Sequence, residues 1–243
     1  SQTFPPKVLE EANTLGDKVT SRDCKGRKDF RQTFTLTIDP LDARDFDDAL
    51  SLKYLDHGEL EIGVHIADVS HYVRRGSALD HEARKRGNST YLVGEVVPML
   101  PHSLSSGICS LVEGQDRLVK SVVFRFSSAG ELLGHQLFES VICSDKRLTY
   151  EQAMLLLKHD KIDEVLSSSP PPSRYSGNPG KPLGEVPEQT LKKIHQAVKT
   201  LGEIAAHLRS KRMQAGSLEL SSTEVKILVD DWGKPEKIYQ NIL

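Results

Sequence analysis

The stretch LVKSVVFRFSSAGELLGHQLFESVIC, residues 118–143, decides the class of fold. Apolar and polar residues alternate from Leu118 to Phe126, which is the two-residue period of a half-buried strand, and a strand-like pattern continues from Glu131 to Cys143. Between them, Ser127–Gly130 has the composition of a turn. Two strands joined by so short a connection run antiparallel, so the sequence predicts a long hairpin in an antiparallel sheet.

Shorter segments on both sides extend this picture. The turn Asp56–Gly58 separates two apolar segments and suits a second hairpin. The predicted strands are 35–38, 49–55, 60–67, 90–93, 218–220, 225–229 and 236–239. The predicted helices are 77–86 after the N-cap Ser77, 149–158 with Thr149 as the cap, 160–166, and a long amphipathic helix over 188–213. We predict an α+β fold with a mixed, largely antiparallel sheet packed with helices.

The chain divides into two parts. Residues 1–33 are polar and mixed, and they are interpreted as a lead-in segment, with a helix-compatible run over 7–15. Residues 34–243 hold the predicted core. Six of the twelve prolines fall in 167–187, together with three glycines, and this composition favours an exposed loop. The last residues, 239–243, carry no terminating signal, so we expect the chain to be part of a larger domain.

Composition narrows the classes of protein without revealing an activity. Hydrophobic residues make up 37% and charged residues 27%, as in globular proteins, and the formal net charge of −2 favours neither nucleic acid nor membrane. The three cysteines lie far apart, which predicts neither a disulfide framework nor a zinc site. No apolar run approaches the roughly 18 residues of a membrane span, and no secretory signal is recognised, so the expected location is the cytoplasm.

One segment carries candidate chemistry. Residues 37–50 read TIDPLDARDFDDAL, so five carboxylates and one arginine fall within ten residues between two predicted strands. Two carboxylates about 4 Å apart repel by roughly 1 kcal/mol in water and by more near a protein surface. Short loops of oxygen ligands suit the hard cations Mg²⁺ and Mn²⁺, and two such ions can assist phosphodiester hydrolysis. In an extended loop Asp45 and Asp47 face one side and Asp48 the other, so several carboxylates could converge.

This acidic segment has two other interpretations. A solvated acidic turn is the commoner explanation of an aspartate-rich loop, but strands on both sides tie this one to the core. An EF-hand fits poorly, because counting from Asp45 the fifth position is Ala49 and the sixth is not glycine. A divalent-cation site therefore remains the sharper hypothesis.

Five separate blocks carry a family resemblance. They are Ile38–Pro40 through Asp45–Ala49, then Gly63–Ser70, Tyr91–Leu92, Val97–Pro101 and Cys109–Leu111. In their order and spacing they resemble the catalytic RNB domain of the ribonuclease II and ribonuclease R family. Phe4–Pro6 also resembles the entry into this domain, more closely as it stands in ribonuclease R. The resemblance implies that 34–243 is the amino-terminal part of that domain, with its carboxy-terminal part and the cold-shock and S1 domains absent.

The resemblance implies a function and a set of residues. Family members are Mg²⁺-dependent exoribonucleases, with Mn²⁺ as a possible substitute, that hydrolyse single-stranded RNA processively from its 3′ end to nucleoside 5′-monophosphates. The implied metal ligands are Asp39, Asp45, Asp47 and Asp48, and the implied catalytic residues are Asp47, Asp45 and Tyr150. Among them Asp47 is expected to be the most critical, and Asp42 lies outside the set.

Aromatic residues supply the implied contacts to RNA. Tyr91 matches a tyrosine that contacts the 3′-terminal nucleotide, and Tyr150 matches one near the scissile end; each could instead be half-buried core. Where the family often has an aromatic clamp, this chain has Leu220. His65 is interpreted as structural. Basic residues at 74–75 and 84–86 and along the long helix favour an RNA path only modestly. The alternative function is a non-catalytic RNA-binding or interaction module that keeps the fold but not the full site.

Overall fold

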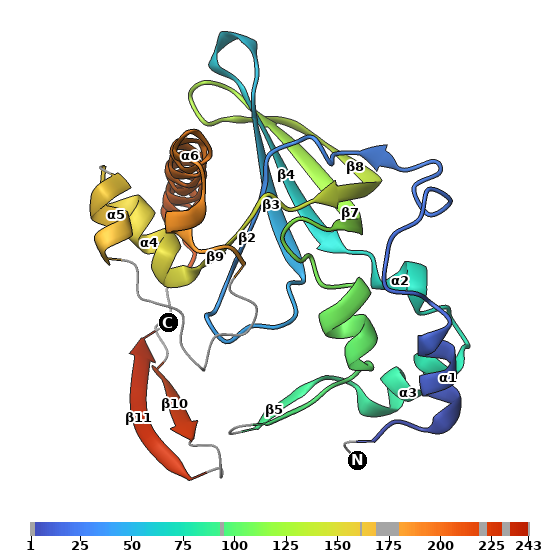
Figure 1. Cartoon of the computed structure of the whole chain (residues 1–243). Coiled ribbons are helices and arrows are strands. Elements are labelled where there is room, and N and C mark those ends of the chain that lie inside the picture. Colours follow the sequence, from blue (N-terminus) through green and yellow to red (C-terminus); the bar gives the residue numbers. More distant parts are fainter. Residues whose placement is uncertain are drawn as a thin grey trace.

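A computed structural model describes residues 3–92, 95–160, 162–168, 180–218, 223–229 and 234–242. The main sheet has seven strands in the order β1-β8-β7-β4-β3-β2-β9, and two small antiparallel ribbons, β5-β6 and β10-β11, lie apart from it (Figure 1). The sheet strands are β1 (Lys28–Asp29), β2 (Thr35–Asp39), β3 (Asp48–Tyr54), β4 (Leu60–Ala67), β7 (Asp116–Phe126), β8 (Leu132–Cys143) and β9 (Lys146–Thr149). The ribbons are β5 (Thr90–Leu92) with β6 (Glu95–Val97) and β10 (Thr223–Val229) with β11 (Pro235–Ile242).

The helices flank the two ends of the sheet (Figure 1). The α-helices are α1 (Pro6–Asn13), α2 (Val69–Tyr72), α3 (Ala78–Arg86), α4 (Tyr150–Lys158), α5 (Ile162–Ser168) and α6 (Glu188–Gln214). Short turns of other helix types are η1 (Asp56–Gly58), η2 (Ser103–Ile108) and η3 (Leu183–Glu185). The two predicted N-caps are confirmed, because the Ser77 and Thr149 side chains accept hydrogen bonds from the backbone of Asp80 and Gln152.

The predicted hairpins form the centre of the sheet. β7 and β8 pair antiparallel over their whole length, and β3 and β4 pair antiparallel around η1. β4 and β7 then pair with each other and complete a four-stranded antiparallel core. The predicted α+β class with a mixed, largely antiparallel sheet is confirmed. The parallel pairs lie at the two edges, where β1 joins β8 and β9 joins β2.

Strand β9 is an element beside the acidic segment that the sequence analysis missed, as it also missed β1, α2 and β6. Its four residues, KRLT, follow β8 after two connecting residues, and they include two basic side chains and only one β-branched residue, so their composition does not indicate a strand. It pairs in parallel with β2, so Thr37 lies opposite Arg147 and Asp39 opposite Thr149. This pairing brings the N-terminus of α4 beside the end of β2, which is the start of the acidic segment.

Two groups of apolar side chains hold helices against the sheet. One contains Leu36, Leu52, Leu148 and the buried face of α6, whose residues Leu191, Ile194, Ala197 and Val198 are almost fully covered. The other joins α1, α3 and η2 to β7 and β8. Because Val8 and Ala12 of α1 belong to it, the lead-in segment is packed onto the body of the fold rather than loosely attached.

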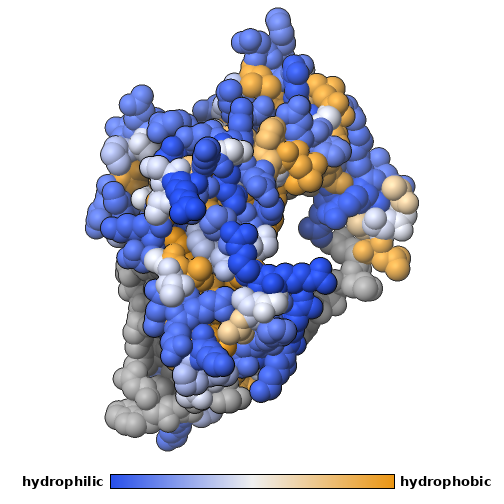
Figure 2. Space-filling view, turned by 90° about the vertical axis from the view of Figure 1, so that its right-hand side faces the viewer, coloured by the Kyte–Doolittle hydropathy of each residue, from blue (hydrophilic) through white to orange (hydrophobic). Residues whose placement is uncertain are grey.

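Two local predictions, the exposed loop over 167–187 and the strand over 218–220, differ from the structure. The loop predicted over 167–187 is not wholly exposed, because Leu183 is 3% exposed and packs in the core; residues 169–179 lie outside the described residues. The predicted strand 218–220 is not found at Leu218, and its other two residues are outside the description. A search of the described helices finds none with the length and apolarity of a membrane span. Leu132, Leu133 and Leu137 of β8 are exposed. Figure 2 shows apolar surface in the upper half of its view.

Candidate active site

The acidic segment, residues 39–48, links the end of β2 to the start of β3. Its backbone is tied down at Phe46, whose N–H donates to Ser110 Oγ (2.9 Å) and whose carbonyl accepts from the N–H of Leu111 (2.9 Å). The Phe46 ring is completely buried, and the carbonyl of Asp47 accepts from Ala67 N–H (2.9 Å). The segment is therefore an anchored loop and not a freely solvated turn. We call residues 39–48 the acidic loop.

Asp39 is the buried member of the acidic loop. Its side chain and backbone together are 9% exposed, and its Oδ2 atom is buried without any hydrogen-bond partner. Burial, and after it the neighbouring charge of Asp48, raise the pKa of Asp39 to about 6, although Arg147 opposes the shift. A buried carboxylate oxygen without a donor is costly unless a cation approaches it. This oxygen fits a hard divalent cation, which is the group that the sequence predicts here.

The other three implied ligands lie nearer to solvent. Asp45 is half-buried, and Asp47 and Asp48 are exposed. The surrounding protein still removes part of the hydration of Asp47, which raises its pKa, and the charges of Asp45 and Asp48 raise it further. The fold thus brings the charges of Asp45 and Asp48 close enough to shift the pKa of Asp47, and the sequence predicts such crowding.

The expected convergence of these carboxylates is not reached. Within the described part of the chain, no three His, Cys, Asp or Glu side chains are arranged so that they could hold one metal ion together. Asp39 is buried in the fold, whereas Asp47 and Asp48 are exposed at its surface. Asp42 is exposed, as expected for a residue outside the site.

Two of the predicted RNA-contacting residues lie at this loop. Tyr91 is 65% exposed on β5, and its hydroxyl donates to Asp45 Oδ2 (3.1 Å). Burial and then Asp45 raise the pKa of this hydroxyl, so it stays a donor. Tyr150 is 54% exposed at the first turn of α4, next to the β9 residue that pairs with Asp39. Neither ring is half-buried core, and Leu220 lies outside the described residues.

Arg147 is a residue near the site that the sequence analysis did not single out. Its side chain is fully buried on β9, and Nη2 donates to the carbonyl of Pro40 (2.6 Å) in the acidic loop. The only sequence signal was an arginine three residues before Tyr150, and nothing in its spacing pointed towards the loop. Contact across 107 residues requires the β2–β9 pairing.

His65 and part of the basic cluster have structural partners. His65 is fully buried and shares its two ring nitrogens with Ser51 Oγ (2.9 Å) and Ser121 Oγ (2.7 Å), which confirms a structural role. Burial lowers its pKa to about 4. In the predicted basic cluster, Arg84 pairs with Asp80 and Arg86 with Glu82. These two arginines therefore brace α3, and the evidence they offered for an RNA path is weakened.

Comparison with known proteins identifies the family. Residues 27–242 match the RNB domain family. The chain belongs to the RNB family. It is 44% identical over 232 residues to ribonuclease R of Thermotoga maritima, in an alignment that covers 95% of this chain and 29% of that protein. The resemblance to ribonuclease R is thereby confirmed, and this RNB chain spans about 29% of the length of that relative.

Solved structures share the fold. An RNase R from Mycoplasma genitalium, in complex with ribose-methylated single-stranded RNA, superposes with a TM-score of 0.77 at 30% identity, over 99% of this chain and 33% of that one. Yeast Ssd1, described as a pseudonuclease, superposes with a TM-score of 0.52 at 27% identity, over 65% of this chain and 18% of that one. A fold similar to that of this chain thus occurs in an RNase R and in a protein described as a pseudonuclease.

Proposed function

We propose that this chain supplies the acidic half of the active site of an RNB exoribonuclease, which hydrolyses single-stranded RNA from its 3′ end, processively and with Mg²⁺, to nucleoside 5′-monophosphates. The observation that carries the proposal is Asp39, whose buried Oδ2 atom has no donor beside a loop bearing three more implied ligands. The similarity to an RNase R bound to single-stranded RNA supports the substrate class.

Each residue of the site has a definable part in this proposal. The Asp39 and Asp48 carboxylates would hold Mg²⁺, with Asp45 assisting, and Asp47 would be the residue on which hydrolysis most depends. Bound Mg²⁺ would supply Lewis-acid stabilisation of the phosphate and a lowered pKa for water. Tyr91, exposed and hydrogen-bonded to Asp45, would contact the terminal nucleotide at the loop. Tyr150, on the neighbouring helix end, would lie near the scissile phosphate.

The direct test is hydrolysis by the full-length protein. A single-stranded RNA with a 5′ label and a separate internal label would be incubated with Mg²⁺, and release of 5′-monophosphates would be followed. Asp47→Asn is expected to slow release by more than about 100-fold, because even outer partners of a metal site cost about 10- to 100-fold when lost. Addition of excess unlabelled RNA after the start tests processivity, since a processive enzyme finishes the strands that it already holds.

Asp42→Asn is the matched control for this assay. Asp42 lies on the same loop, is exposed and is outside the implied set, so removal of its charge should leave the rate within about twofold of the wild type. If Asp47→Asn and Asp42→Asn released monophosphates at the wild-type rate, the assignment of the site would be wrong.

A second function is favoured by one observation, the similarity to the Ssd1 pseudonuclease. In this alternative the chain is a non-catalytic RNA-binding or interaction module that keeps the fold. Titration of Mn²⁺ into the protein by calorimetry separates the two functions. Binding that Asp39→Asn and Asp48→Asn both weaken supports the nuclease, whereas RNA binding without any carboxylate-dependent Mn²⁺ binding supports the module.

A further inference from the structure

We propose that Arg147 is a positioning residue for the acidic loop: from the neighbouring strand it clamps the start of the loop and so fixes the backbone that carries the aspartates proposed to bind a divalent cation. This inference rests on the proposed function, because it assigns the loop a cation as its ligand. It adds Arg147 to the proposed site, which otherwise consists of four aspartates and two tyrosines. Arg147 itself does not face RNA, since it is fully buried.

The contacts of Arg147 are concentrated on the acidic loop. Its Nη2 atom donates to the carbonyl of Pro40 (2.6 Å) and, at 3.4 Å, to that of Leu41. Its guanidinium carbon lies 5.5 Å from the centre of the Phe46 ring, within the range of a cation–π contact. The same side chain therefore contacts the loop near its beginning, at Pro40, and near its end, at Phe46, whose side chain is buried.

The position is an expensive one for a charged side chain. Arg147 is 0% exposed, and its Nε and Nη1 atoms are buried without a hydrogen-bond partner. Removal of an ion from water costs several kcal/mol, which partial hydrogen bonding does not recover. The negative groups that act on it most strongly are Asp39, Glu151 and Asp42. Attraction to the acidic loop and its surroundings is thus the evident compensation for keeping a guanidinium here.

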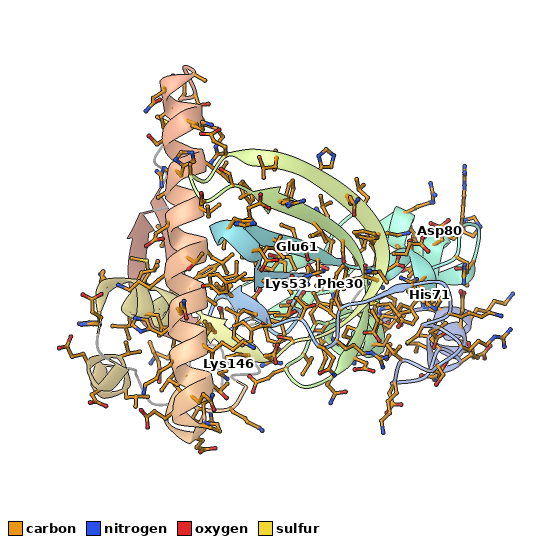
Figure 3. All side chains as sticks on the ribbon, turned by 90° about the horizontal axis from the view of Figure 1, so that it is seen from above. Phe30, Lys53, Glu61, His71, Asp80 and Lys146 are labelled. Carbon is orange, nitrogen blue, oxygen red and sulfur yellow. The ribbon has the colours of Figure 1, made fainter. Side chains whose placement is uncertain are left out.

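The backbone that carries Arg147 is itself held rigidly. Glu113 Oε2 accepts from Lys146 Nζ (2.7 Å) and from the backbone N–H of Arg147 (3.0 Å). Lys146 Nζ also donates to the carbonyl of Lys181 (2.5 Å), which ties β9 to the segment before α6. Figure 3 shows Lys146 close to α6 at this edge of the sheet. Because β9 is held in this way, the Arg147 side chain can restrict the motion of the acidic loop.

Arginine suits this role in a way that lysine does not. A planar guanidinium can donate to two carbonyls and lie over a ring at the same time, whereas an ammonium is a point charge. Removal of the positive charge would by itself favour the binding of a cation. A loss of cation affinity on removing Arg147 therefore cannot be explained by charge and would identify positioning as the cause.

The test compares Arg147→Lys and Arg147→Met with the wild type in the full-length protein. Mn²⁺ affinity would be measured by electron paramagnetic resonance of the free ion, RNA affinity by filter binding in EDTA, and amide hydrogen exchange over residues 41–48 by mass spectrometry. Both variants should bind Mn²⁺ about 10- to 100-fold more weakly, the usual cost of losing an outer partner of a metal site. Exchange over 41–48 should be faster, and RNA affinity should be unchanged.

Two further variants make the result independent of a general loss of stability. Arg27→Lys is the matched control, because Arg27 is also a largely buried arginine that donates to backbone carbonyls, but at the β7–β8 side of the sheet. It should leave Mn²⁺ affinity and exchange over 41–48 unchanged. Phe46→Leu removes the ring beneath the guanidinium and should cause a smaller loss of Mn²⁺ affinity in the same direction, even if an Arg147 variant fails to fold.

Three results would overturn the inference. They are an Arg147→Lys variant with wild-type Mn²⁺ affinity, an Arg147→Met variant that binds Mn²⁺ more tightly, and wild-type exchange over 41–48 in both variants. A wild-type protein that binds no Mn²⁺ would instead contradict the proposed function. The exchange measurement would still decide whether Arg147 holds the loop.

Discussion

Two buried aspartates of this protein have opposite surroundings. The side chain of Asp68 is 2% exposed and accepts from Arg27 Nη2 (2.7 Å) and from Ser70 Oγ (2.7 Å), with Lys120 Nζ 4.0 Å away. Burial alone would raise the pKa of Asp68, but the hydrogen bonds from Ser70 and Arg27 outweigh it, and the pKa is lowered. Asp39 has a buried oxygen without a donor, and its pKa is raised to about 6.

This difference separates a structural carboxylate from one that is available to a ligand. At Asp68 the fold supplies partners for the buried charge, so the carboxylate links Ser70 of α2 to Arg27. At Asp39 the nearby groups are the Asp48 carboxylate, which repels the Asp39 charge, and the Arg147 guanidinium. The Nη2 atom of Arg147 donates its hydrogen bond to the backbone of the acidic loop and not to Asp39. A site left unsatisfied in this way destabilises the protein unless something binds there, and strained electrostatics of this kind is common at functional sites.

The largest expected effect tests the structural member of the pair. Arg27→Met leaves the Asp68 charge buried without its main partner, so we expect the free energy of unfolding to fall by about 3–5 kcal/mol. Urea unfolding followed by circular dichroism measures it. Arg31→Met is the control, because Arg31 pairs with Asp29 at the exposed surface, and it should change stability far less. If both variants lost the same free energy of unfolding, the buried Arg27–Asp68 pair would be no more important for stability than the exposed Arg31–Asp29 pair.

The next effect concerns the pH dependence of stability at Asp39. Its folded pKa of about 6 lies above the ordinary value of 3.8, so the folded state binds the proton more tightly than the unfolded state. Without divalent cations, stability should therefore fall as pH rises from about 4 to about 6. Asp39→Asn should remove this contribution and leave the variant more stable than the wild type at pH 7, by on the order of 1 kcal/mol.

The measurement at Asp39 is the wild-type minus Asp39→Asn difference in urea midpoint between pH 4 and pH 7, in EDTA. The subtraction cancels the contribution of His65, which is present in both proteins. Because the pKa of His65 is lowered in the folded state, its contribution makes stability fall as the pH drops below the ordinary histidine pKa of 6.5. With Mg²⁺ the wild type should gain stability at pH 7 and lose that gain below about pH 6, where protons compete. A flat difference across this range would mean that Asp39 carries no unsatisfied charge.

The smallest expected effect is at the rim of the site. Tyr91→Phe removes only the hydroxyl that donates to Asp45, at an exposed position, so turnover of RNA should fall by no more than about fivefold, the scale of a single hydrogen bond. RNA affinity should not change, because the ring remains. Tyr91→Ala should weaken RNA binding by about 1–3 kcal/mol through loss of stacking. Single-turnover rates and filter binding separate the two, and equal behaviour of both variants would assign the whole effect to the hydroxyl.

Local patterns predicted much of the fold. The alternation in 118–143, the turn at Asp56–Gly58 and the caps Ser77 and Thr149 all form as expected, because each depends on residues within a few positions of one another. β9 could not be predicted in the same way, since its residues KRLT include only one β-branched residue and its pairing with β2 is non-local. The burial of Leu183 was missed because composition describes a segment and not the surface against which it packs.

The sequence by itself determined the presence of the acidic loop, the type of fold and the family, because these follow from residue types in a fixed order along the chain. Only the tertiary structure decided which aspartate is buried, that Tyr91 meets Asp45, and that Arg147 reaches the carbonyl of Pro40. The physical reason is that burial, pKa and hydrogen bonding depend on what lies across the sheet. Residues 107 positions apart become neighbours only when β9 pairs with β2.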